Sequence, residues 1–78
     1  MGDMPHTLEL YGASGCPYTA ELRDQLELQG TAFVEFDVER DPNALQRLLE
    51  LSGTRSVPTL VERGHVIAVG WQGRCCMV

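Results

Sequence analysis

The residues of this sequence best able to do chemistry are its three cysteines. Cys16 opens a Cys-Pro-Tyr-Thr motif, whereas Cys75 and Cys76 are adjacent in the last segment of the sequence. An odd number of cysteines, in a sequence without a recognisable export signal, is more typical of catalytic or metal-binding thiols than of structural disulfides. The cysteines therefore predict thiol chemistry.

Cys16 is expected at the start of a helix. Residues 7–11 alternate between apolar and polar types, as a strand does, and the glycines of residues 12–15 indicate a loop. Pro17 suits the first position of a helix, which makes Cys16 its N-cap. The N–H groups of the first turn would then face the Cys16 sulfur, and the helix dipole would favour a thiolate. Both effects lower the pKa of the thiol, and the thiolate is the nucleophile of disulfide exchange.

A second segment that could contribute to a functional site is Ser56-Val57-Pro58-Thr59. A proline that opens a strand removes a hydrogen-bond donor from the sheet and therefore needs a structural reason. A cis Val57–Pro58 bond is one such reason, because it would turn the chain sharply and leave the N–H and C=O of Val57 free. The segment therefore predicts that the backbone of Val57 faces a ligand.

The remaining pattern predicts the elements that must position these two segments. The first helix should bury Leu22 and Leu26 and expose Arg23 and Glu27 as a pair. The fold class is α/β in the order β-α-β-α-β-β, with the first two strands parallel and the last two joined as a hairpin. The predicted elements are strands over residues 7–11, 31–38, 59–62 and 66–69 and helices over 17–29 and 42–52, the second capped by Asp41.

Length and charge restrict the possible functions. A sequence of 78 residues supports one domain, with residues 1–6 as an extension and 74–78 as a cysteine-containing tail. The net charge of −5, with scattered arginines as the only basic residues, argues against nucleic acid as a partner. No apolar stretch is long enough to cross a membrane. We expect a cytoplasmic monomer that binds no membrane.

Together, Cys-Pro-Tyr-Thr at 16–19 and Val-Pro at 57–58 make the sequence resemble a glutaredoxin of the thioredoxin superfamily. The likeness covers nearly the whole chain, from about residue 7 to residue 73, and includes the order of the elements. It implies a four-stranded mixed sheet with strand order 2-1-3-4, a cis Pro58 close to Cys16, and a terminal helix that is truncated here. It also implies glutathione as co-substrate, no tightly bound cofactor, and oxidised or glutathionylated proteins as partners.

The resemblance also assigns positions for binding glutathione. The peptide backbone of glutathione would pair with Val57 as an added strand does. Arg55 matches a basic position that meets the glycyl carboxylate, although a solvated turn residue is an equal alternative. Pro17 and Tyr18 would flank the tripeptide. Gly70 matches a glycine turn whose free N–H groups would hold the γ-glutamyl carboxylate.

Two positions depart from the family pattern. Ala13 replaces the usual lysine three residues before the catalytic cysteine, which removes one cationic contact to glutathione. Trp71 follows Gly70, in a segment without the aspartate that the family has there. Its aromatic ring either stacks on a ligand or packs over the gap left by the truncated helix.

The resemblance implies a thiol-disulfide oxidoreductase with a single thiol in its motif. Thr19 stands where a dithiol member has its second cysteine, and its hydroxyl could donate to the Cys16 sulfur. In a monothiol mechanism the Cys16 thiolate attacks a glutathione mixed disulfide, and a second glutathione regenerates it. Cys75 or Cys76 could instead resolve Cys16, because the tail is long enough to fold back over the site. Uncommitted tail thiols are the alternative.

Two other functions are compatible with the sequence. A carrier of an iron–sulfur cluster would hold it with Cys16 and glutathione, although the usual motif of such members is Cys-Gly-Phe-Ser. His6 and His65 could join the cysteines around zinc or copper, but no pair except the adjacent Cys75 and Cys76 has the spacing of metal ligands, and we expect no metal site. A redox-inactive thioredoxin-like interaction module is the other alternative. An unshifted pKa of Cys16 would favour that module.

Overall fold

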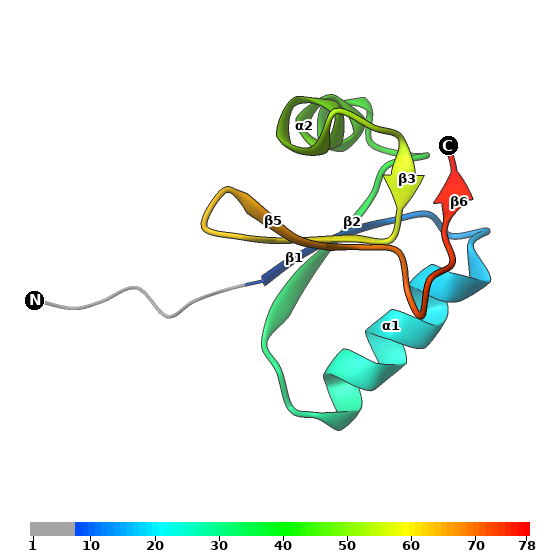
Figure 1. Ribbon diagram of the computed structural model, residues 1–78, viewed down its shortest axis with the longest axis vertical. Helices are drawn as coiled ribbons and strands as arrows, with labels where there is room; N and C mark the ends of the chain where they lie inside the picture. Colours follow the sequence, from blue (N-terminus) through cyan, green and yellow to red (C-terminus); the bar gives the residue numbers. More distant parts are fainter. Residues whose placement is uncertain (1–7) are drawn as a thin grey trace, which may run out of the picture.

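The computed structural model describes residues 8–78, so the predicted extension over 1–6 lies outside the described residues (Figure 1). The predicted order of helices and main strands is confirmed, and two short strands are added. The elements are β1 (Leu8–Gly12), α1 (Pro17–Leu28), β2 (Phe33–Asp37), α2 (Pro42–Ser52), β3 (Ser56–Val57), β4 (Thr59–Glu62), β5 (His65–Val69) and β6 (Cys76–Met77). Within residues 8–78, no helix is both long and apolar enough to cross a membrane.

The main sheet has four strands in the order β2-β1-β4-β5. β1 is parallel to β2 and antiparallel to β4, and β4 is antiparallel to β5. Because β4 and β5 are the third and fourth predicted strands, the expected mixed sheet of order 2-1-3-4 is confirmed. The turn between them has positive φ at Arg63 (53°) and Gly64 (78°), as a tight hairpin turn requires. β3 and β6 form a separate two-stranded sheet that was not predicted.

Both helices begin and end at residues that the sequence marks. Cys16 is the N-cap of α1 in an extended conformation, with Pro17 in the first turn. The Asp41 side chain caps α2 by accepting the N–H groups of Asn43 (3.0 Å) and Ala44 (3.3 Å). α2 stops at Gly53, which has a left-handed conformation with φ 74°. The start of α1 therefore places the Cys16 sulfur at its N-terminal end.

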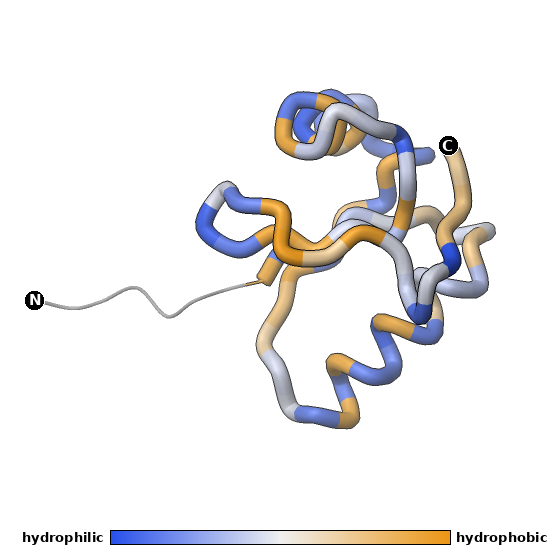
Figure 2. The backbone as a smooth tube through the Cα atoms, viewed as in Figure 1, coloured by the Kyte–Doolittle hydropathy of each residue, from blue (hydrophilic) through white to orange (hydrophobic). Residues whose placement is uncertain are grey.

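The two helices cover opposite faces of the main sheet (Figure 1). Successive residues of a strand point to opposite faces, so Leu10 packs toward α1 with Leu22 and Leu26, whereas Tyr11 packs toward α2 with Leu48. Figure 2 shows the apolar residues concentrated along the central strands and the inner sides of the helices. The larger cluster, on the α2 face, also includes Cys16, so the predicted reactive thiol lies at the border of the core.

One expectation about contacts was wrong. Arg23 does not pair with Glu27 but donates to both carboxylate oxygens of Glu35 on β2, at 2.6 and 2.7 Å. The two parallel hydrogen bonds of this bidentate pair make it stronger than a single contact between residues four apart on a helix. Within the described residues no helix follows β5, and residues 74–78 instead run back along β3 and contribute β6.

Candidate functional site

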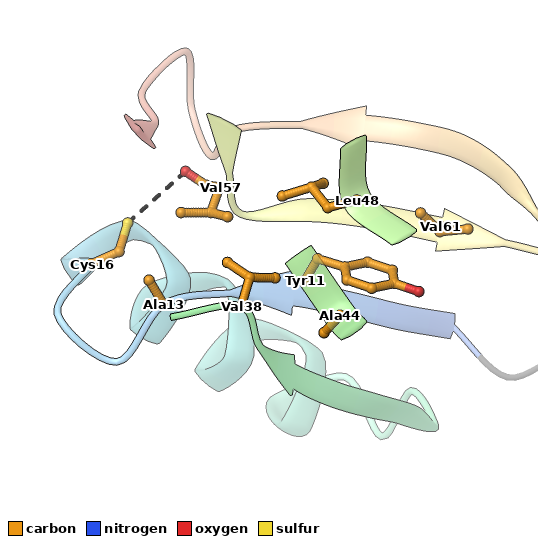
Figure 3. Close-up of a cluster of buried hydrophobic side chains, with 8 residues drawn as sticks. All are labelled: Tyr11, Ala13, Cys16, Val38, Ala44, Leu48, Val57 and Val61. Carbon is orange, nitrogen blue, oxygen red and sulfur yellow. Dashed lines mark hydrogen bonds between the residues drawn. The ribbon is translucent and has the colours of Figure 1, made fainter. Parts of the chain in front are cut away.

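Cys16 and Val57 face one another at the edge of the larger core cluster (Figure 3). The Cys16 thiol donates to the carbonyl oxygen of Val57 over 3.9 Å. The Val57–Pro58 bond is cis, and both predictions, the cis bond and its closeness to Cys16, are confirmed. Cys16 is only 2% exposed, so the sulfur lies beneath other atoms in this structure.

The surroundings of Cys16 favour its thiolate. Burial alone would raise its pKa, but hydrogen bonds from Cys76, from the hydroxyl of Thr19 and from the N–H groups of Thr19 and Tyr18 outweigh burial. The pKa of Cys16 is therefore lowered. The neutral Cys16 side chain makes no capping hydrogen bond to α1. The N–H groups of the first turn therefore stabilise chiefly the charged form of the sulfur, the thiolate. A lowered pKa is the property that the N-cap position predicts.

Thr19 anchors the first turn of α1 beneath the loop. Its side chain is fully buried, and its hydroxyl oxygen accepts the N–H of Ala13 at 3.4 Å. The hydroxyl proton therefore remains available to the Cys16 sulfur, in agreement with the pKa-lowering contact. Ala13, which stands where the family has a lysine, is 4% exposed and packs in the same cluster as Cys16. This position therefore contributes packing.

The structure brings one of the two tail thiols to Cys16. Cys76 lies opposite Val57 in the β3–β6 pair, is half-buried and packs against the cluster that contains Cys16. Its hydrogen bond with Cys16, followed by burial, raises the pKa of Cys76 to about 11. Cys75 is exposed. All three cysteines are free thiols, and the pKa of Cys16 is lowered whereas that of its neighbour Cys76 is raised.

Arg55, Val57 and Gly70 already have partners within the chain. The backbone of Val57, which was expected to be free for a ligand, pairs with Cys76 of β6. Arg55 donates from Nη1 to the main-chain oxygen of Val78 (3.4 Å), and its own carbonyl accepts the Val78 N–H (3.0 Å). The N–H of Gly70 donates to the carbonyl oxygen of Pro58 over 2.6 Å. Gly70 therefore does not present the free N–H that was expected for a carboxylate in this conformation.

The aromatic residues assigned to the site differ in position. Tyr18 is half-buried and packs against the cluster of Cys16, and Pro17 is exposed beside it. Trp71 instead packs against the apolar cluster on the α1 face, and its Nε1 donates to Glu21 at 3.2 Å. An open pocket of about 310 Å³ beside Trp71 does not include Cys16; its lining is Glu21, Asp24, Gln25, Leu28, Trp71 and Gln72. Packing, the second of the two roles considered for Trp71, is the one the contacts support.

Sequence reasoning missed the strand β6. The turn that leads into β6 lies in residues 71–74, where Gln72 and Gly73 both have positive φ (52° and 78°) and turn the chain back. Figure 2 shows the apolar stretch that follows this turn and ends beside β3.

The described residues, 8–78, hold no group of three or more His, Cys, Asp and Glu side chains suited to binding a metal ion, and His6 lies outside that range.

Comparison with known proteins identifies relatives of the same architecture. A family model described as Glutaredoxin matches residues 8–67. A mutant of the thioredoxin-like protein BC3987 is 35% identical, with 88% of this chain and 86% of that chain covered and a TM-score of 0.77. A glutaredoxin from Archaeoglobus fulgidus is 20% identical (87% and 78% covered, TM-score 0.75). A buckwheat glutaredoxin–glutathione complex is 22% identical (83% and 61% covered, TM-score 0.68). No curated protein matches the chain.

Proposed function

This chain belongs to the glutaredoxin family, and from that premise we propose that it is a glutathione-linked thiol-disulfide oxidoreductase with Cys16 as its nucleophile. The observation that carries the proposal is the Cys16 sulfur at the start of α1, with a lowered pKa and beside the backbone of Val57. A thiolate at a helix start is the arrangement that disulfide exchange requires. The family and fold support this kind of reaction, and its glutathione specificity is our proposal.

The mechanism uses one thiol of the motif. The Cys16 thiolate attacks the glutathionyl sulfur of a mixed disulfide; a bond between these sulfurs forms, and the substrate thiolate leaves and takes up a proton. A second glutathione thiolate then attacks the glutathionyl sulfur on Cys16, which releases glutathione disulfide and restores the Cys16 thiolate. Thr19 stabilises that thiolate both as nucleophile and as leaving group. The cycle needs no resident cofactor.

Glutathione is proposed to bind along β3. An extended tripeptide that takes the place of β6 can pair with the main chain of Val57 as one strand pairs with another, which would present its sulfur to Cys16. The Arg55 side chain is exposed at the same edge and would meet the glycyl carboxylate. The buckwheat relative was solved as a complex with glutathione, which supports the choice of ligand. The same reaction extends to glutathionylated proteins as substrates.

A mixed-disulfide assay tests this function. The wild-type protein should accelerate reduction of a small glutathione mixed disulfide by glutathione, and Cys16→Ser should fall to the uncatalysed rate, because serine is a poor nucleophile toward sulfur. Cys75→Ser is the matched control, since it removes an exposed thiol outside the site and should leave catalysis intact. Undiminished activity of Cys16→Ser would contradict the proposal.

A further inference from the structure

The tail, residues 74–78, lies along the edge of β3 to which the proposed function assigns the substrate backbone. β6 pairs antiparallel with β3, and Cys76 stands opposite Val57. The Val78 N–H donates to the Arg55 carbonyl (3.0 Å), and hydrogen-bonded pairs alternate along an antiparallel ladder, so Val57 and Cys76 form the next such pair. The Arg55 guanidinium also donates to Val78. The tail therefore contacts the same backbone and the same cation that are proposed to hold glutathione.

A defined turn directs the tail onto this edge. Trp71 and Arg74 exchange two backbone hydrogen bonds of 2.7 and 3.0 Å around Gln72 and Gly73. Both central residues have positive φ, as in the turns that close two-residue hairpins. The returning chain packs closely on Gly70, where a Cβ atom would lie 2.8 Å from the Arg74 carbonyl oxygen. The tail is thus held by turn geometry, by packing and by strand pairing together.

Cys76 is placed where the cysteine of a bound peptide would lie. It pairs with Val57, the residue whose carbonyl oxygen is 3.9 Å from the Cys16 sulfur. It packs in the cluster of Cys16, and each of the two thiols shifts the pKa of the other. Cys75 is exposed. The fold therefore distinguishes two adjacent cysteines by position, one next to Cys16 and one in solvent.

We propose that Cys76 is the resolving thiol of Cys16 and that β6 is a tethered strand which leaves the β3 edge to admit a disulfide substrate and then returns. This inference rests on the proposed function, since it requires Cys16 to be the nucleophile. The 2% exposure of Cys16 with β6 in place means that the tail must move before a substrate sulfur can reach it.

The chemical steps balance without any oxidant other than the substrate. The Cys16 thiolate attacks a disulfide R–S–S–R′, forms Cys16–S–S–R and releases R′–S⁻, which takes up a proton. Cys76 then loses its proton to solvent and attacks the Cys16 sulfur; the Cys16–Cys76 disulfide forms and R–S⁻ leaves. The substrate has gained two electrons, and the protein has lost them. Two glutathione molecules or one external dithiol restore the two thiols.

The proton arrangement sets the order of these steps. While Cys16 is a thiolate, its hydrogen bond from Cys76 is the largest cause that raises the pKa of Cys76 to about 11. Once Cys16 is in a mixed disulfide, that charge is gone and Cys76 loses this cause of its high pKa. Cys76 is therefore a poor nucleophile before the first step and a better one after it.

The first test follows the product of oxidation. Reduced wild type, Cys75→Ser and Cys76→Ser are each treated with glutathione disulfide, quenched with acid and analysed by intact and peptide mass spectrometry. Wild type and Cys75→Ser should lose two hydrogens and yield a Cys16–Cys76 linked peptide. Cys76→Ser should accumulate a stable glutathione adduct on Cys16.

The outcomes separate the inference from the proposed function. A glutathione adduct on Cys16 that is as stable in wild type as in Cys76→Ser, or a Cys16–Cys75 linkage, overturns the resolving role of Cys76 while leaving Cys16 as the nucleophile. No modification of Cys16 in any of the three proteins overturns the proposed function and with it this inference.

The second test concerns the tethered strand. In a Cys75→Ser/Cys76→Ser background, Cys16 is the only thiol, so its alkylation rate reports its accessibility. Val78→Pro removes the N–H that donates to Arg55, whereas Val78→Ala keeps it. Loss of one ladder hydrogen bond should raise the alkylation rate about two- to tenfold in the proline variant relative to the alanine variant. Equal rates would show that β6 does not cover Cys16.

Discussion

The side chain of Thr19 packs directly beneath the backbone of Gly12, and this contact joins the end of β1 to the first turn of α1. A Cβ atom at Gly12 would overlap Cγ2 of Thr19 and lie 2.9 Å from its hydroxyl oxygen. Thr19 is fully buried, so it has no free space into which to move. The helix that carries Cys16 therefore keeps its place on the sheet only with a glycine at position 12.

Gly12→Ala should destabilise the reduced protein by about 1–3 kcal/mol, because overpacking forces the strand end and the helix apart. Urea unfolding followed by circular dichroism measures this loss. Gly15→Ala is the matched control, since its Cβ would meet only Glu39 Oε1 at 4.0 Å and its effect should be small. In the double variant Gly12→Ala/Thr19→Ala, the two costs should be clearly less than additive. Equal stability of the two single glycine variants would contradict the contact.

Thr19→Val should raise the pKa of Cys16, because the hydroxyl that stabilises the thiolate is replaced by a methyl group of similar size. The pH profile of iodoacetamide alkylation at Cys16, read by peptide mass spectrometry, should shift to higher pH. Thr31→Val replaces a half-buried threonine that makes no contact assigned to Cys16, and its profile should match wild type. A profile of Thr19→Val that is unchanged would exclude the hydroxyl as a donor to the sulfur.

The stability of the reduced protein should depend on pH with opposite signs for the two neighbouring thiols. The pKa of Cys16 is below its usual 9.0, so its contribution is present above 9.0 and is lost as pH falls through the folded-state pKa. The pKa of Cys76 is raised to about 11, so its contribution is present below 9.0 and is lost as pH rises toward 11. Tyr11, whose pKa burial raises, adds to the loss above 10.0.

Urea unfolding across this pH range separates the two thiols. Between pH 9 and 11, the free energy of unfolding of Cys76→Ser should fall less than that of wild type. In Cys16→Ser, the free energy of unfolding should not show the increase that wild type shows as pH rises toward 9. Cys75→Ser serves as the reference for removing a tail thiol. Parallel pH curves for Cys75→Ser and Cys76→Ser would mean that Cys76 does not interact with Cys16.

Trp71→Ala should destabilise the protein by about 2 kcal/mol, since the half-buried ring packs on the α1-side cluster and donates to Glu21. Trp71→Phe keeps most of the packing and should recover most of that stability. If Trp71 serves packing, the KM of Trp71→Phe for a glutathione mixed disulfide should equal that of wild type. A KM that rises severalfold in Trp71→Phe at unchanged stability would restore ligand stacking as its role.

Much of the fold was predictable because its signals are local. Cys16, Pro17 and Asp41 mark helix starts through the donors that a first turn leaves unpaired, and Gly53 marks an end through its left-handed conformation. The parallel pairing of the first two strands followed from the strand–helix–strand unit, and the hairpin of the last two from the short turn after β4, whereas the full strand order was implied by the resemblance to glutaredoxins. The position of Cys16 at the start of α1 depends only on these signals.

Contacts between distant segments were not predictable in the same way. β3 and β6 have two residues each, which is too short for an alternating pattern to show. Their pairing depends on a turn at Gln72 and Gly73 that lacks the Asn-Gly signature of such turns. Whether Arg23 pairs within its helix or with Glu35 likewise depends on how α1 lies against β2. The identity of the thiol beside Cys16 therefore emerged only from the three-dimensional arrangement.

β6 also protects the protein from other copies of itself. An unpaired strand edge exposes N–H and C=O groups that can recruit another strand and start aggregation. In the resting state the tail fills that edge of β3, and Cys76 and Val78 pack against the core, whereas Met77 faces solvent. When the tail leaves to admit a substrate, the edge becomes open to any extended chain. Self-association through β3 should therefore increase only when the tail is displaced from that edge.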